Sequence, residues 1–183
     1  QGNQLPAYCK SHVLGDFIEL ALNTGCRKAE LLNLKWDHVD FSTRLLHLEQ
    51  TKSGEWQTIP ITEEARVVLI RRMRLRDTLS PETSYVFFHQ TAKAGAKVGD
   101  RIKDVRTSFA RACKQARIED FRIHDLRHTY ASWLVMGGVS IYEVSKLLRH
   151  SGVKMTERYA HLAPEYLHDT VANHGFSAHF QHT

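Results

Sequence analysis

The sequence contains little cysteine and lacks a long apolar run. Its three cysteines, Cys9, Cys26 and Cys113, are scattered and odd in number, which is typical of cytosolic thiols and not of a disulfide framework. No apolar stretch approaches the roughly 20 residues that a membrane-spanning helix needs, and no signal-peptide pattern opens the chain. These absences predict a cytoplasmic protein without a membrane partner.

The amounts of hydrophobic and charged residues are ordinary. The hydrophobic fraction is 42% and the charged fraction 25%, as in a typical globular domain. A length of 183 residues suffices for one domain with a full core. Because the chain shows no internal repeat and no second core, we expect a single domain over residues 1–183, with a linker at 1–10 and a tail at 160–183.

Positive charge is in excess and clustered along the chain. The formal net charge is +5 and the pI about 9.2, which favours an anionic partner. Residues 93–117 hold eight basic and two acidic side chains, a local net charge of +6. Such a run is either a solvated helix face or a nucleic-acid-binding surface, and charge alone does not decide between them.

Apolar spacing predicts a mainly helical chain. Thr62 is expected to cap one helix, and Ser140 with Glu143 forms a capping box for another. Arg27 opens a short helix after the Thr24-Gly25 break. The other helices expected from apolar stripes span residues 11–23, 63–76, 100–116, 124–136, 140–148 and 165–172.

Two alternating segments predict a small antiparallel sheet. Residues 45–50 and 55–61 flank Lys52-Ser53-Gly54 and are typical of a hairpin. Residues 85–88 are expected to form a third short strand. The predicted fold class is therefore mixed α and β, mainly α, with a small antiparallel sheet.

The side chains best suited to phosphate chemistry lie in residues 124–159. His124 and Arg127 are one turn apart on one face of a predicted helix, and His150 and Tyr159 follow. A strongly cationic pair at one end and a tyrosine at the other suggest chemistry on a phosphate group.

Two further segments accompany this stretch. T-G-C-R-K-A-E-L-L-N-L places Arg27 at the mouth of a helix, and T-K-S-G places Lys52 at a hairpin tip. Together these parts resemble the tyrosine recombinases of the phage-integrase type, in the family's order and over about residues 13–162. The ordered combination is far more specific than H-x-x-R alone. The matching active-site set is Arg27, Lys52, His124, Arg127, His150 and Tyr159.

The arginines and the tyrosine suit phosphodiester cleavage. The pentacoordinate transition state carries extra negative charge on the non-bridging oxygens, and a planar guanidinium binds two such oxygens while staying charged. Arg27 and Arg127 are expected to form this clamp, with Tyr159 as the nucleophile. A phenol with a pKa near 10 needs help to lose its proton, and neighbouring arginines are expected to favour the phenolate.

The remaining site residues follow mainly from the resemblance. His124 is an acid/base candidate because its pKa lies near working pH. The resemblance implies that His150 donates a hydrogen bond to a non-bridging oxygen and that Lys52 protonates the leaving 5′ oxygen. Glu30, one turn after Arg27, is expected to orient Arg27 or a histidine. The plainer alternatives are surface charges and structural histidines.

One position departs from the family pattern. The family usually has L-G-H before the second histidine, and this chain has L-R-H, with Arg149. If glycine is needed there for the backbone, the local geometry differs, and Arg149 instead adds a phosphate contact. The residues expected to contact DNA are Lys93, Lys97, Arg101, Lys103, Arg106 and Arg149.

Three other functions compete with recombination. His124 and His128 have the i, i+4 spacing of two zinc ligands, but Asp125 stands where zinc proteases have Glu and no third ligand follows at a familiar spacing. A DNA-binding module without catalysis would share the basic segment. A type IB topoisomerase would use similar chemistry without pairing two duplexes.

The resemblance implies a site-specific recombinase or integrase that needs no metal and no other cofactor. Its product is a 3′-phosphotyrosyl link with a free 5′ hydroxyl, and its partner is double-stranded DNA. Four protomers assemble on DNA and exchange their C-terminal tails, whereas a monomer or weak dimer is expected without DNA. The family's N-terminal DNA-binding domain is expected to be absent from this chain, and a bacterial or phage-encoded, nucleoid-associated protein is implied.

Overall fold

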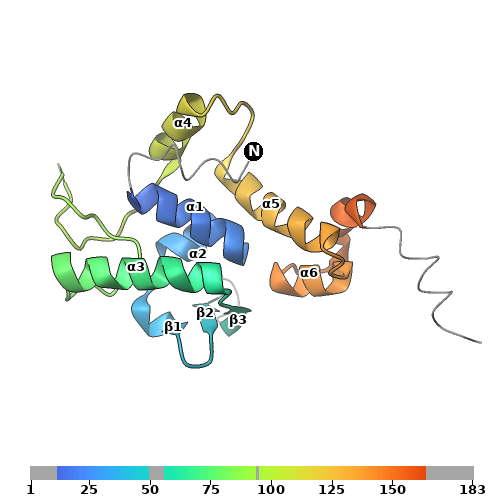
Figure 1. The fold of residues 1–183 in the computed structure, drawn as a ribbon, viewed down its shortest axis with the longest axis horizontal. Coiled ribbons are helices and arrows are strands. Elements are labelled where there is room, and N and C mark those ends of the chain that lie inside the picture. The colour runs from blue at the N-terminus through green and yellow to red at the C-terminus, as the bar shows by residue number, and fades with distance from the viewer. Residues whose placement is uncertain (1–11, 50–55, 94, 164–183) are drawn as a thin grey trace, which may run out of the picture.

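The computed structural model describes residues 12–49, 56–93 and 95–163. Lys52, the linker at 1–10 and the helix expected at 165–172 lie outside the described residues. The elements are α1 (His12–Thr24), α2 (Lys28–Leu32), η2 (Trp36–His38), β1 (Val39–Asp40), β2 (Leu45–Glu49), β3 (Trp56–Pro60), α3 (Glu63–Leu79), α4 (Arg106–Gln115), α5 (Ile123–Met136), α6 (Ile141–Leu147), η3 (Val153–Met155) and η4 (Glu157–Leu162), as drawn in Figure 1.

The sheet is antiparallel, in the order β1-β2-β3. Leu46 pairs with Ile59 across β2 and β3, and both side chains are buried, so one face of the predicted hairpin covers the core. The third strand is β1, which the sequence did not predict.

The prediction of a strand at residues 85–88 is wrong. The backbone of this segment makes two isolated bridges, between Tyr85 and Lys35 and between Phe88 and Arg101, outside the sheet. Three of its apolar side chains, those of Val86, Phe87 and Phe88, are buried in succession, because the segment crosses the core as an irregular connection. A run of buried apolar residues does not by itself distinguish these two structures.

The two predicted caps are confirmed. The Thr62 hydroxyl accepts a hydrogen bond from the Ala65 amide at 3.2 Å, and the Ser140 hydroxyl accepts one from the Glu143 amide at 3.2 Å. Each cap satisfies an amide that the first helical turn leaves unpaired. The following helices, α3 and α6, therefore begin where the sequence places them.

The helix expected from residue 100 begins only at Arg106. The preceding residues are extended, and the Ile102 amide donates to the Phe87 carbonyl at 3.1 Å. Ile102 and Val105 are buried as predicted, but an extended segment lying on the core buries them as well as a helix would. Tertiary contacts therefore override the helical spacing at this end.

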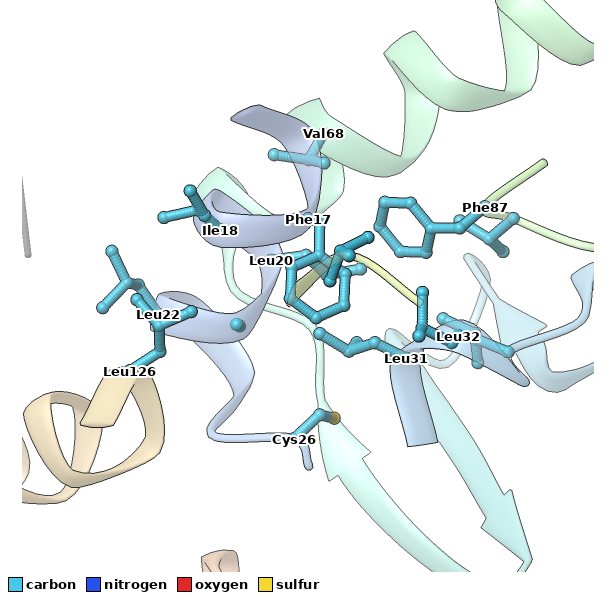
Figure 2. Close-up of a cluster of buried hydrophobic side chains, with 14 of the residues drawn as sticks. Phe17, Ile18, Leu20, Leu22, Cys26, Leu31, Leu32, Val68, Phe87 and Leu126 are labelled. Atoms are coloured by element: carbon cyan, nitrogen blue, oxygen red, sulfur yellow. The ribbon is translucent and has the colours of Figure 1, made fainter. Parts of the chain in front are cut away.

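Two apolar clusters hold the elements together. In the larger one, α1 lies between α3 and α5 (Figure 1) and contributes Phe17, Ile18 and Leu20, each fully buried. Figure 2 shows Leu22 of α1 beside Leu126 of α5, where the two helices meet. The smaller cluster joins α5, α6 and η4 and consists of Ala131, Val135, Val144, Leu148 and Tyr159.

Within the described part of the chain, every helix is too short or too polar to cross a membrane.

Candidate active site

Arg127 of α5 joins the two turns that carry other site residues. Its Nη1 donates to the Gly25 carbonyl at 2.7 Å, and its Nη2 donates to the Leu148 carbonyl. Only 3% of the residue is exposed. Burial, followed by the neighbouring charge of Arg27, lowers the pKa of Arg127 to about 10, so it stays charged at neutral pH. These bonds use two of the five N–H donors of the guanidinium.

The turn at Gly25 fits only glycine. Its φ is +61°, and a Cβ there would lie 2.4 Å from the Cδ1 of Tyr130. A side chain would therefore face both an unfavourable backbone and a clash. This turn ends α1 and brings Arg27 to the N-terminus of α2.

Arg27 and Glu30 are linked through both main chain and side chain. The Arg27 amide donates to Glu30 Oε2 at 2.7 Å, and Arg27 Nη1 pairs with Glu30 Oε1 at 2.8 Å. The Arg27 side chain is 43% exposed, so its guanidinium remains accessible to a phosphate. Burial raises the pKa of Glu30, but Arg149 and Arg27 outweigh it and hold that pKa below its ordinary value.

Arg149 does not occupy the exposed position expected of a DNA contact. Its side chain is 3% exposed and its Nη2 lies 2.6 Å from Glu30 Oε2. Its φ is +55°, a left-handed conformation that glycine adopts more readily than arginine. In this structure the Arg149 guanidinium is therefore paired with Glu30 and not presented to solvent. Its backbone adopts the conformation that the family's glycine would favour, so the expected difference in local geometry is not seen.

His150 follows this turn and is held by Thr156. Its Nδ1 lies 2.7 Å from the Thr156 hydroxyl, and Thr156 is fully buried. Burial, with the positive charges of Arg127 and Arg27, lowers the pKa of His150 to about 4. The imidazole is therefore neutral at pH 7, and when Thr156 donates, the proton resides on Nε2, which can donate to a phosphate oxygen.

Tyr159 lies in η4, 6% exposed, and its hydroxyl is hydrogen-bonded to Nδ1 of His128. Burial raises the pKa of Tyr159 despite the opposing charges of Arg158 and Arg127. The neighbouring arginines favour the phenolate, as expected, but burial is the larger effect and keeps the pKa of Tyr159 above its ordinary value.

Three aromatic rings follow one another from α5 to η4. The rings of His124 and His128 meet edge to face, with centroids 4.7 Å apart, and those of His128 and Tyr159 are 5.9 Å apart. Burial lowers the pKa of both histidines. The i, i+4 spacing placed both histidines on one helix face but suggested His128 only as a metal ligand, so its contact with Tyr159 was not predicted.

The described residues give no support to the metal-hydrolase alternative. Within residues 12–49, 56–93 and 95–163, no group of three or more His, Cys, Asp or Glu side chains could hold a metal ion. His124 packs against His128, and His128 is hydrogen-bonded to Tyr159.

Most of the basic segment lies at the surface. Lys93, Lys97 and Lys103 are exposed, Arg106 pairs with Asp104 at 2.5 Å, and Arg101 bonds to the Asn33 side chain. These positions are compatible with phosphate contacts, but two of the five cations are already held by neighbouring side chains.

A mainly helical domain with a small antiparallel sheet, two arginines, paired histidines and a buried tyrosine defines the class of tyrosine-recombinase catalytic domains. The chain belongs to the phage integrase family, whose sequence model matches residues 3–166. It is 36% identical over 162 residues to the integrase of Salmonella phage P22, covering 84% of this chain and 40% of that protein. The chain spans less than half the length of the curated relatives that it matches.

Solved structures confirm the predicted fold class. The catalytic domain of bacteriophage HP1 integrase matches with a TM-score of 0.69 and 30% identity, over 96% of this chain and 92% of that one. The integrase of transposon Tn1549, solved in complex with circular intermediate DNA, matches with a TM-score of 0.72 and 21% identity, over 94% of this chain and 62% of that one. The second likeness concerns the fold alone.

Proposed function

We propose that this domain cuts and rejoins double-stranded DNA through a covalent 3′-phosphotyrosyl intermediate and so catalyses site-specific recombination. The observation that carries the proposal is the position of Arg127. It is buried, still charged, and bonded to the turns that precede Arg27 and His150. One guanidinium therefore brings the other two phosphate-binding candidates into one site.

Each side chain then has a separate part in cleavage. The Tyr159 oxygen attacks phosphorus, its bond to the 3′ phosphate forms, and the bond to the 5′ oxygen breaks. Arg27 and Arg127 stabilise the added negative charge. His150 donates from Nε2 to a non-bridging oxygen.

Two protons move in this step. The phenol proton leaves Tyr159 for the imidazole that already contacts its hydroxyl, His128. The leaving 5′ oxygen takes a proton from Lys52, whose role rests on the resemblance because Lys52 lies outside the described residues. The phosphoester energy is kept in the phosphotyrosyl bond, so rejoining by a 5′ hydroxyl of another duplex needs neither ATP nor a metal.

The partner is double-stranded DNA, held by phosphate contacts from the exposed lysines of the basic segment. Assembly of four protomers on DNA with exchange of the tail at 160–183 belongs to the same proposal, and so does a cytoplasmic, bacterial or phage-encoded setting. The tail from residue 164 onward lies outside the described residues.

The deciding experiment traps the covalent intermediate. The protein is incubated with nicked candidate sites in EDTA, and any DNA–protein adduct is mapped by mass spectrometry. We expect an adduct on Tyr159 in the wild type and none in Tyr159→Phe, which should bind DNA nearly normally because only one oxygen is lost. An adduct that persists in Tyr159→Phe contradicts the proposal. Relaxation of supercoils without strand exchange would identify a topoisomerase instead.

A further inference from the structure

Arg149 adopts a backbone conformation that its side chain does not favour. Its φ of +55° places it in the left-handed region, where an L-residue brings its Cβ close to the backbone. Glycine avoids this cost. The backbone alone therefore does not account for an arginine at this position.

The Arg149 guanidinium lies inside the protein and is paired there. Nη2 lies 2.6 Å from Glu30 Oε2, with side chains that are 3% and 17% exposed. Nη1 donates to the Leu147 carbonyl at 2.9 Å. A buried charge is tolerated when it is paired and hydrogen-bonded, and here its partner is 119 residues away in the chain.

The Glu30 carboxylate divides its two oxygens between two arginines. Oε1 accepts from Arg27 Nη1, and Oε2 accepts from both the Arg27 amide and Arg149 Nη2. The bond from Arg149 therefore fixes the carboxylate that in turn holds the Arg27 guanidinium. Without the bond from Arg149, the only hydrogen bond from the described residues to Glu30 Oε2 would come from the Arg27 amide at the start of the same helix.

A second connection runs beside this one between the same two turns. Arg127 donates to the carbonyls of Gly25 and Leu148, which are near neighbours in sequence of Arg27 and Arg149. One connection thus passes through Arg127, and the other passes from Arg27 through Glu30 to Arg149. The two together fix how far apart the turns lie.

We propose that Arg149 is a positioning residue for DNA cleavage, which sets the direction of the Arg27 guanidinium through Glu30 and does not itself touch DNA. This inference rests on the proposed function. It differs from a simple stabilising role because it predicts an altered pH dependence of cleavage.

The charges that face Glu30 give the sign of that pH dependence. They are those of Arg27, Arg149 and Arg127, and the neutral thiol of Cys26 lies nearby. Burial raises the pKa of Glu30, and Arg149 is the largest influence that lowers it. Removal of Arg149 therefore raises the pKa of Glu30. A protonated Glu30 holds Arg27 less well, so cleavage should be lost at a higher pH.

The test compares Arg149→Gly with Arg149→Lys, Glu30→Gln and a matched control. Arg149→Gly relieves the backbone while it removes the guanidinium. Arg44→Gly is the control, because Arg44 has a φ of +56° and an exposed side chain in a turn before β2. The rate of adduct formation on saturating nicked DNA is measured from pH 4 to 9, together with DNA affinity and thermal melting.

We expect Arg149→Gly to slow adduct formation about 10-fold at pH 7 and to leave DNA affinity unchanged. The acidic limb of the pH profile, where the rate falls as the pH drops, should move to higher pH. Arg149→Lys should restore part of the rate, and Glu30→Gln should be slow without the acidic shift. An unchanged rate and limb in Arg149→Gly would overturn the inference, and so would a loss confined to DNA affinity. If Arg149→Gly does not fold, the rates and pH profiles of Arg149→Lys and Glu30→Gln are compared instead. An Arg149→Lys variant with the wild-type rate and pH profile would then overturn the inference.

A measurement without DNA separates this inference from the proposed function. The pKa of Glu30 is followed by carboxyl ¹³C NMR in the wild type, Arg149→Gly and Arg149→Lys. If the wild type forms no adduct on Tyr159, the proposed function fails. The link from Arg149 to Glu30 then stands only if that pKa rises in Arg149→Gly, and an unchanged pKa overturns it.

Discussion

The hydroxyl of Tyr159 and the Nδ1 of His128 are hydrogen-bonded across 31 residues of sequence. Burial raises the pKa of the phenol and lowers the pKa of the imidazole, so both groups are neutral at pH 7. A neutral imidazole whose Nδ1 faces a phenol can accept its proton. His128 therefore holds the proposed nucleophile, Tyr159, and is placed to accept its proton.

His128→Ala should slow formation of the Tyr159 adduct by about 100-fold, the lower end of the range for a lost acid/base group. DNA affinity should change little, because His128 is half-buried and its ring is hydrogen-bonded to Tyr159. His161→Ala is the control, since His161 is an exposed histidine on η4, the short helix that carries Tyr159. Single-turnover rates on nicked DNA measure the effect. Cleavage by His128→Ala at the wild-type rate would show that the hydrogen bond is incidental.

The two clamp arginines differ in burial, and substitutions should separate their roles. Arg27→Ala should leave the melting temperature nearly unchanged, because that side chain is 43% exposed, while it slows cleavage by about 100-fold or more. Arg127→Ala should abolish cleavage and also lower the free energy of unfolding by about 2–4 kcal/mol, because two carbonyls lose a buried donor. Thermal melting and denaturant unfolding compare the two variants. Equal stability losses would contradict this division.

The sequence predicted the parts of the fold that depend on local signals. The helices α3 and α6 were found through the caps at Thr62 and Ser140, and the β2–β3 hairpin through alternation. The start of α4 and the path of residues 85–88 were missed, because both are decided by packing of extended segments on the core. Intrinsic preference is a weak guide where tertiary contacts compete with it.

The sequence predicted which residues belong to the candidate site better than it predicted how they contact one another. Glu30 was expected to orient Arg27 or a histidine because it matches the family's acidic position, one turn after that arginine. The pairing of Glu30 with Arg149 joins residues far apart in the chain, and spacing does not reveal such a contact. Likewise, the rise in the pKa of Tyr159 depends on burial, which the half-polar sequence around it did not indicate.

His150 should make the fold sensitive to acid. Its pKa is lowered from an ordinary 6.5 to about 4 in the folded protein, so between these values the unfolded chain binds a proton that the folded chain does not. Stability therefore falls as the pH drops from about 6.5 to about 4. Denaturant unfolding across this range should show a shallower loss in His150→Gln than in the wild type. The exposed His161→Gln serves as control, and equal slopes in all three proteins would contradict the assignment.

DNA binding should depend on salt through the exposed lysines of the basic segment. If Lys97 and Lys103 each neutralise a phosphate, their replacement by glutamine should reduce the slope of log affinity against log salt by about 1 per residue. Arg74→Gln, which removes an exposed cation on α3, is the matched control and should leave the slope unchanged. Arg149→Gly should leave it unchanged too, because its guanidinium is occupied by Glu30. Gel-shift titrations at several salt concentrations supply the slopes. A reduced slope in Arg149→Gly, with normal slopes in the lysine variants, would return Arg149 to the phosphate contacts and remove the two lysines from them.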